Sequence, residues 1–151
     1  MQSCKRDIMW REYIQTLEPG ATFFSGATPS ELSTLEATFG LVLPEELRSL
    51  LTESNGVRGT SGLRLIWAVE EMTKRNMEMR TAPSFRDNFP FDHLLFFADA
   101  GNGDQFALGM IQRAIKRPAI SVWNHEDDSR TWVAPTLKRY LEWWVSGKLT
   151  I

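Results

Sequence analysis

Two short acidic stretches hold the residues best suited to chemistry. The first is the tip Gly-Asn-Gly-Asp at residues 101–104, which separates two hydrophobic runs. The second is Asn-His-Glu-Asp-Asp at residues 124–128, which follows another hydrophobic run. Glycine-rich turns can cradle phosphate, and Asp, Glu and His side chains can hold metals or transfer protons. Each of these chemistries demands its own spacing of residues.

The tip does not have the spacing of a phosphate-binding loop. A dinucleotide fingerprint needs a third glycine at the turn from a strand into a helix, whereas position 106 is Phe and a strand-like run follows it. The Gly-Lys-Ser/Thr of a P-loop is also absent. The sequence therefore does not predict phosphate binding here.

A calcium site at the tip is no better supported. Calcium loops alternate Asp and Asn ligands and usually close with a bidentate Glu. Asp99, Asn102 and Asp104 do not have that spacing, and the closing Glu is missing. We interpret the tip as the turn of a hairpin in which Gly101 and Gly103 adopt positive φ, with Asp104 displayed to a partner.

The stretch at residues 124–128 could hold a metal or an acid–base pair, because His125 adjoins three carboxylates. Adjacent residues on an extended chain point to opposite faces, so they cannot all converge. A solvated loop is the favoured interpretation, and a hydrolase that uses His125 is the alternative. For nucleophilic catalysis the sequence offers little: it has no G-x-S-x-G elbow, and its single cysteine, Cys4, lies near the N-terminus. A Ser-His-Asp triad assembled from distant residues stays open. We predict no enzyme, no cofactor and no metal.

The tryptophans near the C-terminus provide a third candidate. Trp144 continues the 3-4-3 spacing of Leu137, Tyr140 and Leu141, which predicts a helix with Trp144 in the core. Trp143 falls off that stripe and is expected to be the more exposed of the two. It is either a partner contact or a partly covered surface residue.

The elements that position these residues are helical at both ends of the chain. Helices are predicted over 10–17, from Thr28 to Gly40 with a capping box to Glu31, and from Pro44 onward. Residues 69–80 form another helix, with Val69, Met72 and Asn76 on one side. A final helix starts near Pro135 and ends at Gly147.

Strands are predicted in the middle of the chain. The alternating residues 62–67 predict a half-buried strand, and residues 81–92 an irregular crossing segment. Three further strands, predicted at 93–98, 105–111 and 119–124, are expected to form an antiparallel meander. This order predicts an α+β fold: a mainly antiparallel sheet flanked by N-terminal helices and a C-terminal helix, in a single domain over 1–151.

The composition restricts the partners. Seventeen Lys and Arg against nineteen Asp and Glu give a net charge of −2 over 151 residues, which does not attract nucleic acid or an anionic membrane. Charges interrupt the apolar runs at the N-terminus, so no signal peptide is expected, and no stretch reaches the ~20 apolar residues of a membrane span. We expect a cytoplasmic protein with a protein partner, and the oligomeric state stays open.

Four stretches in order resemble one family, the SUKH superfamily, whose best-known branch is the Smi/Knr cell-wall regulators. The resemblance covers about residues 28–145. The matching features are Leu35-Glu36 with Gly40, Leu43-Pro44, Asn55-Gly56 and the glycine-glycine-aspartate tip. At the tip the sequence departs from the family, because an Asn separates the glycines and Ala107-Leu108 stands where members often carry a further acid.

The resemblance implies an α+β binding protein and not an enzyme. Many bacterial members look like immunity proteins that block polymorphic toxins, often nucleases, whereas the fungal branch acts as a regulatory scaffold. A nuclease site is basic, so an inhibitor gains from carboxylates that steer the encounter. The residues predicted to bind the partner are Glu70, Glu71, Asp99, Asp104, Glu126, Asp127, Asp128 and Trp143. The alternative is that these acids are only solvated.

Overall fold

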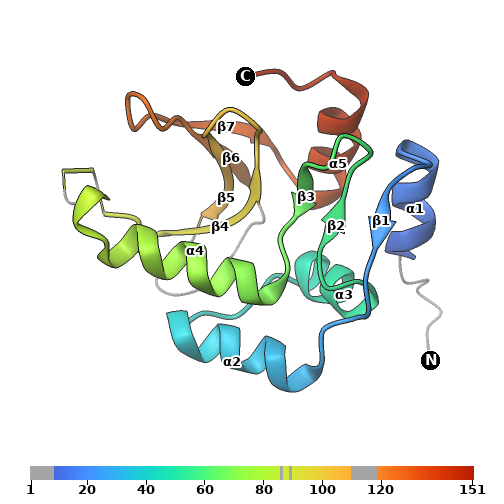
Figure 1. Ribbon diagram of the computed structural model, residues 1–151, viewed down its shortest axis with the longest axis horizontal. Helices are drawn as coiled ribbons and strands as arrows, with labels where there is room; N and C mark the ends of the chain where they lie inside the picture. Colours follow the sequence, from blue (N-terminus) through green and yellow to red (C-terminus); the bar gives the residue numbers. More distant parts are fainter. Residues whose placement is uncertain (1–8, 86, 89, 110–118) are drawn as a thin grey trace.

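The computed structural model describes residues 9–85, 87, 88, 90–109 and 119–151, and it places two antiparallel sheets among helices (Figure 1). The helices are α1 (Trp10–Leu17), α2 (Pro29–Phe39), α3 (Glu45–Glu53), α4 (Val69–Thr81) and α5 (Leu137–Ser146), with a 3₁₀ turn η1 (Pro83–Phe85). The strands are β1 (Thr22–Phe23), β2 (Val57–Arg58), β3 (Arg64–Ile66), β4 (Leu94–Asp99), β5 (Gln105–Gly109), β6 (Ile120–Trp123) and β7 (Arg130–Ala134). The predicted α+β class with a mainly antiparallel sheet and flanking helices is confirmed.

The predicted capping box of α2 is present. The Thr28 hydroxyl accepts a hydrogen bond from the Glu31 N–H, and the Glu31 carboxylate accepts one from the Thr28 N–H. The helix ends at Gly40, whose φ of 64° lies in the left-handed region that glycine adopts without a steric penalty. Local sequence alone therefore determines both ends of this helix.

Carboxylates from α3 cap two other helices. Glu53 accepts hydrogen bonds from the first backbone N–H groups of α1, Trp10 at 2.9 Å and Arg11 at 3.0 Å. Glu46 accepts one from Leu137 N, the first residue of α5, at 2.9 Å. Each bond satisfies a donor that a helix leaves unpaired at its N-terminus. These contacts join helices from the two ends of the chain.

The strands form two sheets, ordered β1-β2-β3 and β4-β5-β6-β7. The predicted meander is confirmed as β4, β5 and β6, while Met110 and Ile111 lie outside the described residues. The predicted strand at 62–67 is confirmed as β3, but its half-buried alternation was wrong, because the consecutive residues Leu65 and Ile66 are both buried. The strands β1, β2 and β7 were not predicted from the sequence.

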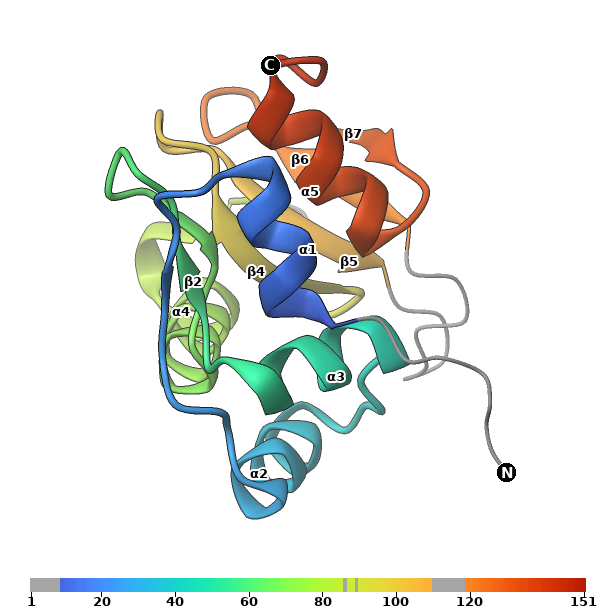
Figure 2. The ribbon, with the colours of Figure 1, turned by 90° about the vertical axis from the view of Figure 1, so that its right-hand side faces the viewer.

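One hydrophobic core joins all five helices to the sheets, and its aromatic part lies between α5 and the four-stranded sheet. Figure 2 shows α1 and α5 in front of that sheet, and Figure 1 shows α4 running beside β4. Tyr140 of α5 packs edge-to-face on Phe97 and Phe106, with ring centroids 5.2 and 4.8 Å apart. Trp144 packs on Phe106 at 5.0 Å, yet it is only half-buried, as is Trp143. The predicted contrast between these two tryptophans is therefore weaker than expected.

Within the described part of the chain, no helix is long and apolar enough to cross a membrane.

Candidate partner-binding surface

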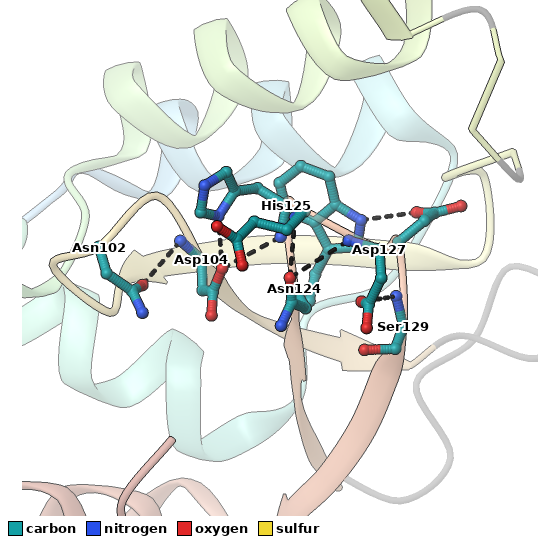
Figure 3. Close-up of polar contacts among 9 residues, drawn as sticks. Asn102, Asp104, Asn124, His125, Asp127 and Ser129 are labelled. Atoms are coloured by element: carbon teal, nitrogen blue, oxygen red, sulfur yellow. Dashed lines mark hydrogen bonds and ion pairs between the residues drawn. The ribbon is translucent and has the colours of Figure 1, made fainter.

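The tip and the acidic turn lie side by side at one end of the four-stranded sheet (Figure 3). The tip joins β4 to β5 and the turn joins β6 to β7, and the pairing of Gln105 with Trp123 brings both loops to the same end of the sheet. The ring Nδ1 of His125 lies 2.6 Å from Oδ1 of Asp104. We call the exposed part of these two loops the tip–turn surface; it consists of Gly101, Asn102, Gly103, His125, Glu126 and Asp127.

Asp104 is the buried centre of this arrangement. Its residue is only 6% exposed, and its Oδ1 accepts hydrogen bonds from both the ring and the backbone N–H of His125. Its own N–H donates to Oδ1 of Asn102 at 3.0 Å. The expectation that the tip displays Asp104 to a partner was wrong, because a residue 21 positions away pairs with the carboxylate inside the protein.

The glycines of the tip have the backbone that the sequence predicted, with φ of 96° at Gly101 and 99° at Gly103. At Gly103 a Cβ would lie 2.9 Å from the ring of His125, closer than carbon atoms approach. Glycine is therefore favoured at position 103 for two reasons, the left-handed backbone and the contact with the imidazole.

The turn at residues 124–128 is ordered by its own side chains (Figure 3). Oδ1 of Asn124 accepts hydrogen bonds from the N–H groups of Glu126 at 2.8 Å and Asp127 at 3.3 Å. Asp127 accepts one from Ser129 N at 2.9 Å, and this bond lowers the pKa of the Asp127 carboxyl. Glu126 and Asp127 thus stand in solvent on a turn with a fixed backbone.

Asp128 has an internal role instead. It adopts a positive φ of 63°, and its carboxylate accepts hydrogen bonds from Trp123 Nε1 at 2.7 Å and Arg130 at 3.0 Å. Arg130 also donates to the carbonyl of Pro90 at 3.1 Å. Asp128 therefore ties the turn to the crossing segment rather than extending the exposed acidic surface.

The other predicted residues lie on different elements. Asp99 accepts a hydrogen bond from Trp67 Nε1 at 3.0 Å, and Glu71 lies 4.0 Å from Nε of Arg64. Glu70 lines a hollow between α2 and α4, and Trp143 lines another beside Val133. The structure thus groups four of the predicted acids at the tip and turn, namely Asp104, Glu126, Asp127 and Asp128. A role for any of the eight in binding stays a prediction.

Three residues organise the surface in a way that the sequence did not predict, although Asn102 and His125 were weighed there as possible ligands. Asn102 and Asn124 each accept a backbone hydrogen bond from a residue two positions later, the usual Asx-turn geometry. An Asn two positions before an acidic residue is the signal that could have identified both turns. The third is His125, whose pairing with Asp104 has no local signal in the sequence.

The Asp104–His125 pair has the geometry that orients an imidazole in acid–base chemistry. Among the described residues, no serine, threonine or cysteine side chain makes a hydrogen bond to that ring, and no cluster of His, Cys, Asp and Glu is arranged to hold a metal. What the contacts do support is a mechanical role: the pair fastens the turn to the tip.

The pKa of Asp104 provides a test of that role. Burial raises this pKa, but the hydrogen bonds from His125 outweigh burial, and the pKa falls below its ordinary value of 3.8. A carboxyl with a lowered pKa in the folded state adds stability above about pH 4 and loses it as the pH falls further.

We therefore expect Asp104→Asn to lower the free energy of unfolding by about 1.5 kcal/mol at pH 7. The difference from wild type should shrink as the pH falls below about 4. Urea denaturation at pH 7 and pH 3 measures both values. Asp87→Asn, at an exposed position, is the control. A cost that is equal at both pH values would contradict the assignment.

Comparison with protein families adds the decisive observation. The family model described as SMI1-KNR4 cell-wall, SUKH_6, matches residues 29–141. The chain belongs to the SUKH family. The match runs from the first residue of α2 into α5 and includes the tip and the turn, which confirms the resemblance read from the sequence. No curated protein matches the chain. The family suggests protein–protein interaction as the mode of action of this SUKH domain.

Proposed function

We propose that this SUKH domain is an immunity protein that acts in the cytoplasm, without catalysis or a cofactor, and neutralises a cognate toxin by direct binding. Family membership supports this class of function. The observation that carries the proposed site is the pair of exposed carboxylates, Glu126 and Asp127, on a turn that Asp104 and His125 fasten to the tip.

The physical basis is electrostatic complementarity, together with a small loss of conformational entropy when the turn binds. A toxin that cleaves nucleic acid must present a basic site to phosphates, and carboxylates attract such a surface and increase the association rate. The side-chain hydrogen bonds of Asn124 and Asp104 already fix the backbone of the turn. Binding therefore need not order the loop, and less of the interaction energy is lost.

Charge reversal at the turn tests the site. Glu126→Lys with Asp127→Lys is expected to raise the Kd for the toxin domain by roughly tenfold or more, because attraction becomes repulsion. The matched control is Glu78→Lys with Asp87→Lys, which changes the net charge equally at exposed positions on α4 and after η1. Equal losses in both double variants would exclude the tip–turn surface.

The function itself needs a separate experiment. The tagged protein is used to capture its partner from lysate of its own organism, and the captured candidate toxin domain is then expressed in cells with and without this SUKH domain. Survival only in its presence, together with a measurable Kd in vitro, is the expected result. A captured toxin that kills equally well in both strains would refute the immunity proposal.

A regulatory or scaffold role for cell-envelope or signalling proteins is the second candidate. The matched family model supports it, since its description refers to the cell wall. Capture of endogenous envelope or signalling proteins, with no toxin and no protection, would favour this role.

A further inference from the structure

The chain contains two Asn-Gly pairs, Asn55-Gly56 and Asn102-Gly103. Asparagine is a thermolabile residue, and it deamidates most readily before glycine. Glycine has no side chain to shield its backbone nitrogen from the neighbouring carboxamide. Because the residue after the asparagine is the same in both pairs, we attribute a difference in their reactivity to the fold.

The fold protects the first pair. Gly56 is buried, and its N–H donates to the carbonyl of Ser54 at 2.8 Å. Oδ1 of Asn55 accepts a hydrogen bond from Val69 N, at the start of α4, at 2.8 Å. The nitrogen that would attack is thus bonded to another group, and the carboxamide is held on another element. Reaction at Asn55 would require both hydrogen bonds to break.

The second pair is accessible. Asn102 and Gly103 are both exposed, and neither the N–H of Gly103 nor Nδ2 of Asn102 donates to any residue that the structure describes. The attacking nitrogen and the leaving amide at the tip are therefore not restrained by any described residue.

The one hydrogen bond of the Asn102 side chain favours the reaction. Its Oδ1 accepts from Asp104 N at 3.0 Å (Figure 3). This Asx turn folds the carboxamide back over the backbone of Gly103. The donated N–H also polarises the carbonyl group, because attack at Cγ places negative charge on Oδ1. The side chain of Asn102 is therefore both close to the attacking nitrogen and activated.

We propose that Asn102 is a site of spontaneous deamidation, by which the tip–turn surface gains a carboxylate. The backbone nitrogen of Gly103 attacks Cγ of Asn102 and loses its proton. The bond from Cγ to Nδ2 breaks, so that ammonia leaves and a succinimide ring forms. Water then opens the ring at either carbonyl, which produces aspartate or isoaspartate. No atom is oxidised or reduced, and solvent water is the only co-reactant.

The product changes the charge and the backbone of the surface. A neutral amide becomes a carboxylate, so the net charge of the chain changes by one, from −2 to −3. The new carboxylate lies on the same surface as the exposed acids Glu126 and Asp127. In the isoaspartate product the main chain runs through the former side chain and is longer by one methylene group. This inference goes beyond the proposed function and does not depend on it, because the reaction needs no partner.

Mass spectrometry of the purified, folded protein after incubation at neutral pH tests the proposal. Trypsin cleaves after lysine and arginine, so Asn102 lies in peptide 87–113 and Asn55 in peptide 49–58. Deamidation is expected to add about 1 Da at Asn102. Its rate should exceed the rate at Asn55 by roughly tenfold or more. An isoaspartyl methyltransferase should label peptide 87–113 in preference to peptide 49–58.

Incubation in guanidinium chloride is the matched control, because it removes the fold and leaves the sequence unchanged. Both Asn-Gly pairs should then react at similar rates. In the folded Asn102→Ser variant, peptide 87–113 should keep its mass, which assigns the change to Asn102 rather than to another amide of that peptide. Equal rates at the two pairs in the folded protein would overturn the proposal. So would a difference that persists in the unfolded chain, or a gain of mass in Asn102→Ser.

Discussion

Replacing Asn76 with leucine is expected to lower the free energy of unfolding by about 4 kcal/mol. Asn76 is 1% exposed, and its amide pairs with both the N–H and the C=O of Phe96. Leucine fills a similar volume but leaves both backbone groups of Phe96 buried without a partner, and each such group costs about 1–3 kcal/mol. Urea denaturation monitored by tryptophan fluorescence measures the loss.

Glu78→Leu is the control for this change, because it introduces the same side chain at an exposed position on the same helix. Its effect should stay within about 0.5 kcal/mol. If the two leucine variants were equally stable, the amide of Asn76 would not be what holds α4 to β4, and the coverage of that sheet edge would need another cause.

Replacing Gly103 with alanine is expected to cost about 3 kcal/mol, with roughly half from the backbone and half from the displaced imidazole. The residue has a φ of 99°, which alanine adopts only with strain, and the new Cβ would lie 2.9 Å from the ring of His125. The ring must move, and its hydrogen bond to the buried carboxylate of Asp104 is then lost.

Gly62→Ala separates these two contributions. Gly62 has a similar φ of 90°, but no atom lies within 4 Å of the position of its Cβ. This variant should therefore cost only the backbone strain, about 1–2 kcal/mol. Thermal and urea unfolding of both variants gives the difference. Equal losses would indicate that the ring of His125 adapts freely and that its pairing with Asp104 contributes little.

Gly103→Ala also tests the proposed function. If the tip–turn surface binds the partner, Gly103→Ala should weaken binding although no charge changes, because the turn that carries Glu126 and Asp127 loses its attachment to the tip. Charge reversal at the turn and loss of the Asp104–His125 contact would then both lower the affinity of the same surface, the first by electrostatic repulsion and the second by disordering the turn. Reduced affinity in both, and not in Gly62→Ala, is the pattern expected of a preorganised binding loop.

The sequence by itself predicted the elements that local patterns encode. The capping box from Thr28 to Glu31 and the left-handed Gly40 bound α2 without help from the rest of the chain. The short apolar runs of β4, β5 and β6 and the positive φ of the tip glycines were predictable for the same reason. The family was also predictable, because its motifs occur in order along the chain.

Only the tertiary structure determined how these elements are joined and which acids stay exposed. The strands β1 and β2 have two residues each, too few for an alternation, so their pairing decides their conformation. Asn76 was predicted on the buried side of its helix, but its partner Phe96 is 20 residues away. Asp104 and Asp127 are both aspartates of acidic loops, and the sequence does not distinguish them. In the structure His125 pairs with Asp104, which is buried, whereas Asp127 stays exposed to solvent. Local spacing specifies periodicity and turns, whereas burial and pairing depend on contacts between distant residues, which no spacing records.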